Sequence, residues 1–83
     1  MYLENKQGGH NKFYEIWSGS YFDKQSGKTN TAFVGSRFGR IGTQGRTIFK
    51  NFTGKYCTGD AHSFFHGKVE EKLRRGYEVV KER

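Results

Sequence analysis

The chain has 83 residues, of which fifteen are Lys or Arg and eight are Asp or Glu, so its formal net charge at pH 7 is +7. A chain of this length has room for one small hydrophobic core, because compact domains need roughly 50–200 residues. No apolar run reaches the roughly 18–20 residues that span a bilayer, and the first residues lack the apolar stretch of a signal peptide. We therefore expect a single domain over residues 1–83, located in the cytoplasm and without contact to a membrane.

The positive charge is confined to one part of the chain. From Lys24 to Gly59 there are seven cations and no acid, whereas the rest of the chain carries eight charges of each sign. The expected core is largely aromatic, because the chain has eight Phe, five Tyr and one Trp and each buried ring removes roughly 150–250 Å² from water. An acid-free segment of this length favours a negatively charged partner.

The first part of the chain predicts a β-hairpin followed by a long loop. Met1–Asn5 and Lys12–Trp17 are the expected strands, because a glycine-containing turn separates them and the second is rich in residues that favour strands. Ser18–Thr31 is polar and contains Gly, Ser and Asn. We expect a loop there.

Two further strands are expected in the middle of the chain, at Ala32–Gly42 and Gly45–Phe52. A two-residue turn between them is predicted because the flanking glycines permit positive φ. That register would place Phe38 opposite Phe49 and Arg37 opposite Lys50. Phe38 and Phe49 would then share one face of the sheet, and Arg37 and Lys50 the other.

From Asp60 onward the apolar residues recur with a helical period, and Asp60 itself is a suitable N-cap. The apolar positions of this helix are Ala61, Phe65, Val69 and Leu73. Gly76 is a stop signal, and Tyr77–Val80 is expected to return as an edge strand. The order of elements predicts an α+β fold, a mainly antiparallel twisted sheet of four to five strands with one helix packed on one face.

No residue pattern amounts to a catalytic or metal site. Ser26–Thr29 ends like a phosphate-binding loop, but Phe22 stands where the motif needs its first glycine and no helix follows. His62 and His66 are one helical turn apart, with Cys57 upstream, but no carboxylate completes a metal site and we expect two histidines on a helix surface. The prediction is a protein that is not an enzyme and needs no cofactor and no metal.

The glycine-spaced hairpin Gly35–Arg46 contains the parts of a nucleic-acid contact surface. Guanidinium groups bind phosphate through paired donors, an aromatic ring stacks on a sugar or base, and a neighbouring glycine lets a ligand approach the backbone. The alternative is that the arginines keep an exposed hairpin soluble and that Phe38 belongs to the core. The predicted nucleic-acid-binding residues are Arg37, Phe38, Gly39, Arg40, Arg46 and Lys50.

The same hairpin resembles the WGR domain, a family named for a Trp-Gly-Arg triplet followed by a hydrophobic residue and glycine. Here the triplet is Phe38-Gly39-Arg40 within Ser36–Gly45. The resemblance implies a twisted antiparallel sheet with one helix. It extends to Asn11–Ile16, Lys50–Phe52 and Lys68–Tyr77.

The WGR family is best known from DNA-damage-responsive poly(ADP-ribose) polymerases, where it contacts the end of a broken strand, and it also occurs as short bacterial proteins. The resemblance implies that Phe38 stands where the family's Trp stacks on the terminal sugar, and Arg40 where its Arg links DNA contact to neighbouring domains. Phe keeps a stacking face and lacks the indole N–H donor. We predict a non-catalytic module that binds nucleic acid, DNA rather than RNA. The alternative is a protein-interaction module that docks an acidic partner on the same hairpin; the oligomeric state is left open.

Overall fold

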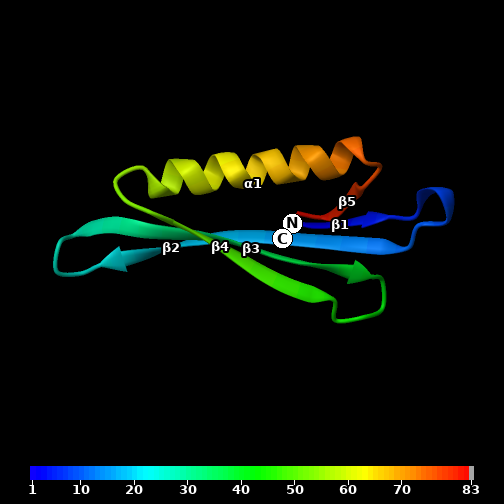
Figure 1. Ribbon diagram of the computed structural model, residues 1–83, viewed down its shortest axis with the longest axis horizontal. Coiled ribbons are helices and arrows are strands. Elements are labelled where there is room, and N and C mark those ends of the chain that lie inside the picture. The colour runs from blue at the N-terminus through cyan, green and yellow to red at the C-terminus, as the bar shows by residue number, and fades with distance from the viewer. Residues whose placement is uncertain (83) are drawn as a thin grey trace.

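A computed structural model describes residues 1–82 of the chain, and within them five strands form one antiparallel sheet in the order β4-β3-β2-β1-β5. One helix lies along this sheet (Figure 1), so the predicted α+β fold is confirmed. The expected N-terminal hairpin is confirmed by the pairing of β1 with β2. The elements in chain order are β1 (Tyr2–Asn5), η1 (Gln7–Gly9), β2 (Lys12–Asp23), β3 (Lys28–Arg40), β4 (Arg46–Thr53), α1 (Cys57–Arg74) and β5 (Glu78–Lys81).

Helix α1 covers one face of the sheet and leaves the other, the open face, without a second layer (Figure 1). An α-helix turns every 3.6 residues, so apolar residues at steps of four drift around it. Leu73, at the end of the predicted stripe, is therefore 44% exposed. Among residues 1–82 no helix is long and apolar enough to cross a membrane. Phe13 is buried on the open face. The larger cluster of buried residues consists of Leu3, Tyr14, Ile16, Ala32, Val34, Cys57, Ala61 and Val69.

The loop predicted at Ser18–Thr31 is wrong, because β2 and β3 continue through most of this segment as one long hairpin. The chain reverses where Gly27, at φ +70°, donates its N–H to the Asp23 carbonyl at 2.8 Å. A glycine is tolerated within β2 because a ring of the partner strand covers it. A Cβ at Gly19 would lie 2.6 Å from the ring of Phe33.

The predicted register between β3 and β4 is also wrong. Phe38 pairs with Arg46 rather than with Phe49, because β3 ends earlier than expected and a longer loop replaces the two-residue turn. An odd shift of register exchanges the faces of a strand. Lys50 therefore shares the helix-side face with Phe38, whereas Arg37 lies on the open face.

The ends of α1 differ in how well they follow the predicted signals. The helix begins before the expected N-cap, with Tyr56 at the cap and Asp60 inside the first turn, where a carboxylate stabilises the positive end of the helix dipole. The C-terminal stop is confirmed, since Gly76 has φ +98° and Tyr77 donates its N–H to the Lys72 carbonyl at 3.1 Å. The expected final edge strand is confirmed as β5, which pairs with β1.

Candidate nucleic-acid interface

The loop Ile41–Gly45 joins β3 to β4 at one end of the sheet. Thr43 closes it, because its backbone N–H and its Oγ1 both donate to the Arg40 carbonyl, at 3.1 and 2.7 Å. Gly45 has φ +71°, and a side chain at this position would collide with the Phe38 carbonyl. Only glycine fits both conditions without strain. Gly45 therefore fixes the conformation of the loop, and the length of this loop produces a register between β3 and β4 that differs from the predicted one.

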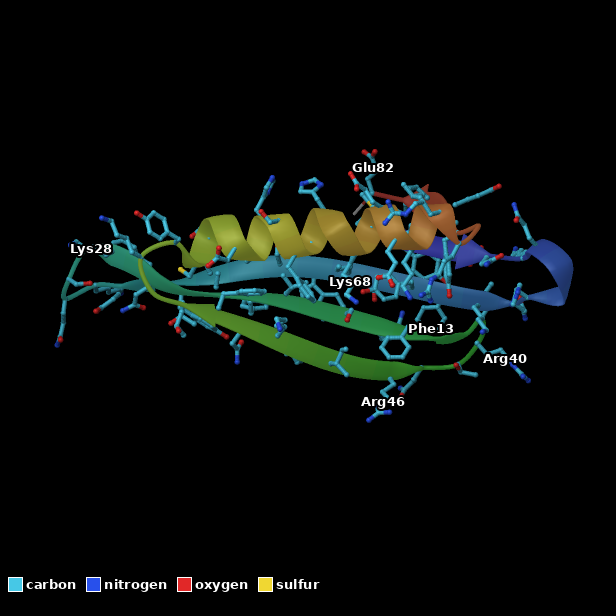
Figure 2. The ribbon with its side chains drawn as sticks, turned by 45° about the horizontal axis from the view of Figure 1, so that its top comes forward. Phe13, Lys28, Arg40, Arg46, Lys68 and Glu82 are labelled. Carbon is cyan, nitrogen blue, oxygen red and sulfur yellow. The ribbon has the colours of Figure 1, made fainter. Side chains whose placement is uncertain are left out.

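Three of the predicted binding residues, Arg40, Arg46 and Lys50, are exposed to solvent, and Arg40 and Arg46 are the two next to the loop. They stand on either side of the loop, and Figure 2 shows the Arg40 side chain extending past the loop and the Arg46 side chain extending away from the outer edge of β4. Neither forms an ion pair with any described residue. Their guanidinium groups are therefore free to bind an external anion.

Arg37, by contrast, is already occupied by the protein itself. Its Nε donates to Glu15 Oε1 at 3.0 Å, and its Nη1 donates to the Gln44 carbonyl at 2.7 Å. Its Cζ lies 4.5 Å from the ring centre of Phe13. Arg37 holds the loop against the open face and so acts within the fold.

Phe38 is half-buried on the helix-side face. Its ring lies 6.2 Å from that of Tyr14, at an interplanar angle of 27°, and packs against the core. The rest of the ring lines a groove of about 200 Å³ between α1 and strands β3 and β4. Gly39, the next residue, packs on the loop, since a Cβ there would lie 2.9 Å from the Cα of Gly45.

The groove also contains two lysines of α1 that the sequence pattern did not single out. Lys68 and Lys72 line it together with Lys50 of β4. The Nζ atoms of Lys50 and Lys68 lie 5.4 and 5.6 Å from the ring centre of Phe64. A signal was present in the sequence, because Phe64, Lys68 and Lys72 recur at steps of four and therefore share one helix face.

The lysines of the groove have different surroundings. The Nζ of Lys72 lies 4.7 Å from the ring centre of Tyr14, and burial lowers the pKa of this ammonium. Lys68 lies 3.4 Å from Glu71, and its charge lowers the pKa of that carboxyl. Within the described part of the chain, Lys50 and Lys72 have no carboxylate at ion-pair distance. The groove thus gathers positive charge that is only partly neutralised.

The remaining sequence candidates lie outside this groove. His62 and His66 are exposed on α1 with ring centres 4.3 Å apart, and Cys57 is fully buried at the start of the helix. No group of three or more potential metal ligands occurs among residues 1–82. Ser26–Thr29 lies at the tip of the β2–β3 hairpin, not between a strand and a helix as in a nucleotide-binding loop.

The chain that forms this site matches a known protein family. The family model of the WGR domain matches residues 1–83, the whole chain. The chain belongs to the WGR family. WGR domains are non-catalytic modules of poly(ADP-ribose) polymerase-related proteins, where they generally bind nucleic acid. No curated protein and no solved structure matches the chain.

In this WGR domain the motif residues are divided between two surroundings. Phe38 turns toward the groove beside α1, and Arg40 extends into solvent at the end of β3. Gly39 joins them and packs against the loop. The half-buried ring of Phe38 and the exposed guanidinium group of Arg40 therefore lie at the same end of the sheet.

Proposed function

We propose that this WGR domain binds DNA through the loop end of the sheet and the adjoining groove. The observation that carries the proposal is the pair of exposed guanidinium groups of Arg40 and Arg46, which have no ion-pair partner among the described residues. Family membership supports a nucleic acid as the anion. The groups act as binding residues only, and no catalytic step, cofactor or metal is part of the proposal.

The edge strand β4 continues the cationic surface. Arg46 lies beside Phe38 on the helix-side face, and Lys50 lies four residues further along the same face. Strand residues rise about 3.3 Å each, so the two backbone positions are roughly 13 Å apart. About four nucleotides of one B-DNA strand cover that length along the helix axis, at about 3.4 Å each. Neighbouring cations of β4 can thus contact phosphates of the same strand.

A strand end suits the groove better than a continuous duplex. The ring of Phe38 is covered on one side by Tyr14 and lines the groove with the rest of its surface. A half-buried ring cannot insert between stacked base pairs, but it can pack against the sugar of a terminal nucleotide. We therefore propose that the terminal nucleotide lies in the groove, with Lys50 and Lys68 close to its phosphate.

Fluorescence anisotropy with a labelled nicked duplex, at several salt concentrations, tests this proposal. The double variant Arg40→Ala/Arg46→Ala should bind more weakly and should lower the slope of log K against log salt by about 2, since each phosphate contact contributes about 0.9. Lys24→Ala/Lys28→Ala is the matched control, because it removes the same charge from the opposite end of the molecule, where Figure 2 labels Lys28.

Equal effects of the two double variants would contradict the proposed position of the site. Salt-independent binding would contradict phosphate recognition altogether. A closed duplex without ends and an RNA duplex of the same sequence complete the series, and we expect both to bind more weakly than the nicked DNA. Co-purifying material that survives nuclease treatment would favour an acidic protein partner instead.

A further inference from the structure

Four aromatic side chains lie in continuous contact on the open face of the sheet. Ring centres are 5.6 Å apart for Tyr21 and Phe33, 6.2 Å for Phe33 and Phe49, and 5.9 Å for Phe49 and Trp17. Tyr21 and Phe49 are each 61% exposed. Single exposed rings are common on proteins, whereas a contiguous group marks a contact surface. These four residues are called the aromatic cluster below.

Two glycines hold rings of the aromatic cluster flat against the sheet. A Cβ at Gly35 would lie 2.5–2.6 Å from three indole atoms of Trp17, and a Cβ at Gly19 would lie 2.6–2.7 Å from two ring atoms of Phe33. Because the backbone covers the inner side of these two rings, their exposed area is on the outer side. The cluster therefore presents ring faces that are already fixed in place, as stacking on a planar ligand requires.

The charge around the aromatic cluster favours an anionic occupant. Two acids of β2 lie two residues from the cluster. Glu15 is neutralised by Arg37 at 3.0 Å, and Asp23, which pairs with Lys28 in the strand register, accepts the backbone N–H of Gln25 at 3.0 Å. A second copy of this chain is a poor occupant, because each copy carries a net charge of +7 and the two cationic strands would face each other. Strands β3 and β4 contain no acid and five cations, Lys28, Arg37, Arg40, Arg46 and Lys50. Arg46 and Lys50 belong to the helix-side face, so they act on the cluster through the positive charge of the edge strand and not by direct contact.

Polar side chains on β4 flank the cluster. Thr47 and Asn51 stand two residues on either side of Phe49 and share its face, opposite Arg37 and Phe33. They supply neutral donors and acceptors for the edges of a base. Planar rings, hydrogen-bonding groups and a positive surrounding potential together match unpaired nucleotides, whereas a duplex keeps its base faces stacked inside.

We propose that the aromatic cluster binds a single-stranded nucleic acid, with unpaired bases stacked on Trp17 and Phe49. This surface is on the opposite side of the sheet from the groove, so it is a second contact site. The choice of a nucleic acid as its occupant rests in part on the function proposed above. The site proposed above for a DNA end, in the groove beside α1, is called the end-binding site. A single strand of DNA that extends unpaired from it would lie on the aromatic cluster.

Trp17 is the only tryptophan of the chain, so its fluorescence reports directly on the proposed site. The full chain is titrated with unstructured single-stranded DNA and, separately, with RNA of the same sequence, each about 12 nucleotides long. We expect saturable quenching, and Phe49→Ala should lower the affinity at least about fivefold, since stacking of each base is worth roughly 1–3 kcal/mol. Tyr56→Ala is the matched control, because it removes a ring that is 72% exposed outside the cluster.

The arms of the experiment separate this site from the end-binding site. Single-strand quenching that depends on Phe49 but persists in Arg40→Ala/Arg46→Ala supports the inference, whatever the duplex measurements show. Absence of quenching, or equal loss in Phe49→Ala and Tyr56→Ala, overturns it even if duplex binding follows the arginines. Self-association that disappears in Phe49→Ala, measured by sedimentation without nucleic acid, also overturns it in favour of a dimer.

Discussion

The open face of the sheet contains two groups of aromatic rings that differ sharply in burial. Phe13, near the loop end, is 2% exposed, whereas Phe49 on the same face is 61% exposed. Phe13 is enclosed by the ring of Tyr2, at 5.8 Å, and by the guanidinium of Arg37, at 4.5 Å. Phe49 contacts other rings but no such cover is present over it among the described residues.

The contrast shows that a sheet face without a second layer is not uniformly exposed. Around Phe13, the long side chain of Arg37 and the β3–β4 loop take the place of a helix. Around Phe49 the flanking residues Thr47 and Asn51 are too short to cover the ring. The first region is therefore part of the structural core, and the second is available to a ligand.

The strongest test of this contrast is the same substitution in each region. Phe13→Ala should lower the free energy of unfolding by about 3–5 kcal/mol, because it leaves a cavity under fixed neighbours. Phe49→Ala should cost less than about 1 kcal/mol. Urea unfolding followed by far-UV circular dichroism measures both. If Phe13→Ala does not fold, Phe13→Leu gives the same comparison with a smaller cavity, and equal costs at the two positions would refute the contrast.

A second test concerns the glycines that hold the exposed rings flat. Gly35→Ala should destabilise the protein by about 1–3 kcal/mol and change the fluorescence of Trp17, because the new methyl group displaces the indole. Gly67→Ala is the matched control, since a Cβ at this helical position meets no atom within 4 Å. It should stabilise the protein by about 0.5–1 kcal/mol. A stable Gly35→Ala variant with unchanged fluorescence would mean that the ring does not rest on this glycine.

The strands were predictable where aromatic and β-branched residues alternate, and not where the partner strand supplies the large side chain. Lys12–Trp17 is recognisable by itself. Ser18–Asp23 is not, because Gly19 is covered by Phe33 from β3, and this pairing is invisible until the strands are aligned. The helix and its glycine stop were predictable because their signals are local.

The candidate site was predictable only in part, because its geometry depends on one loop. The hydrogen bonds of Thr43 to the Arg40 carbonyl set the loop length, and this length decides which face each residue of β4 occupies. Composition alone could not separate Arg37, held by Glu15, from an arginine exposed to solvent. Lys68 joins the groove through tertiary packing of α1.

The third test is substitution of Arg37, because this residue covers the ring of Phe13 and is expected to affect stability and not nucleic-acid binding. Arg37→Ala should destabilise the protein by about 1–2 kcal/mol through loss of the ring contact and of its hydrogen bonds. Arg37→Lys should restore little of this, because an ammonium lacks the planar fork. Arg46→Ala should leave stability within about 0.5 kcal/mol and lower the salt slope of DNA binding by about 1. An equal fall of that slope in Arg37→Ala would show that Arg37 also contacts phosphate.

The smallest expected effect is at the hydroxyl of Tyr2, whose ring covers Phe13. Burial, and the hydrogen bond that the hydroxyl donates to Glu4 at 3.0 Å, raise the pKa of Tyr2 above its ordinary value of 10.0. A group whose pKa is higher in the folded state stabilises the fold fully below its unfolded pKa, and this stabilisation is lost as pH rises through the folded pKa. Tyr2→Phe keeps the ring and removes the hydroxyl, so at pH 7 it should be slightly less stable than the parent. Above about pH 10 its unfolding temperature should fall less steeply with pH, so that the difference between the two proteins narrows. Thermal unfolding at matched pH values measures the difference. Parallel curves for the two proteins would mean that the hydroxyl is as well solvated in the folded state as in the unfolded chain, and that the cover over Phe13 is looser than its 2% exposure implies.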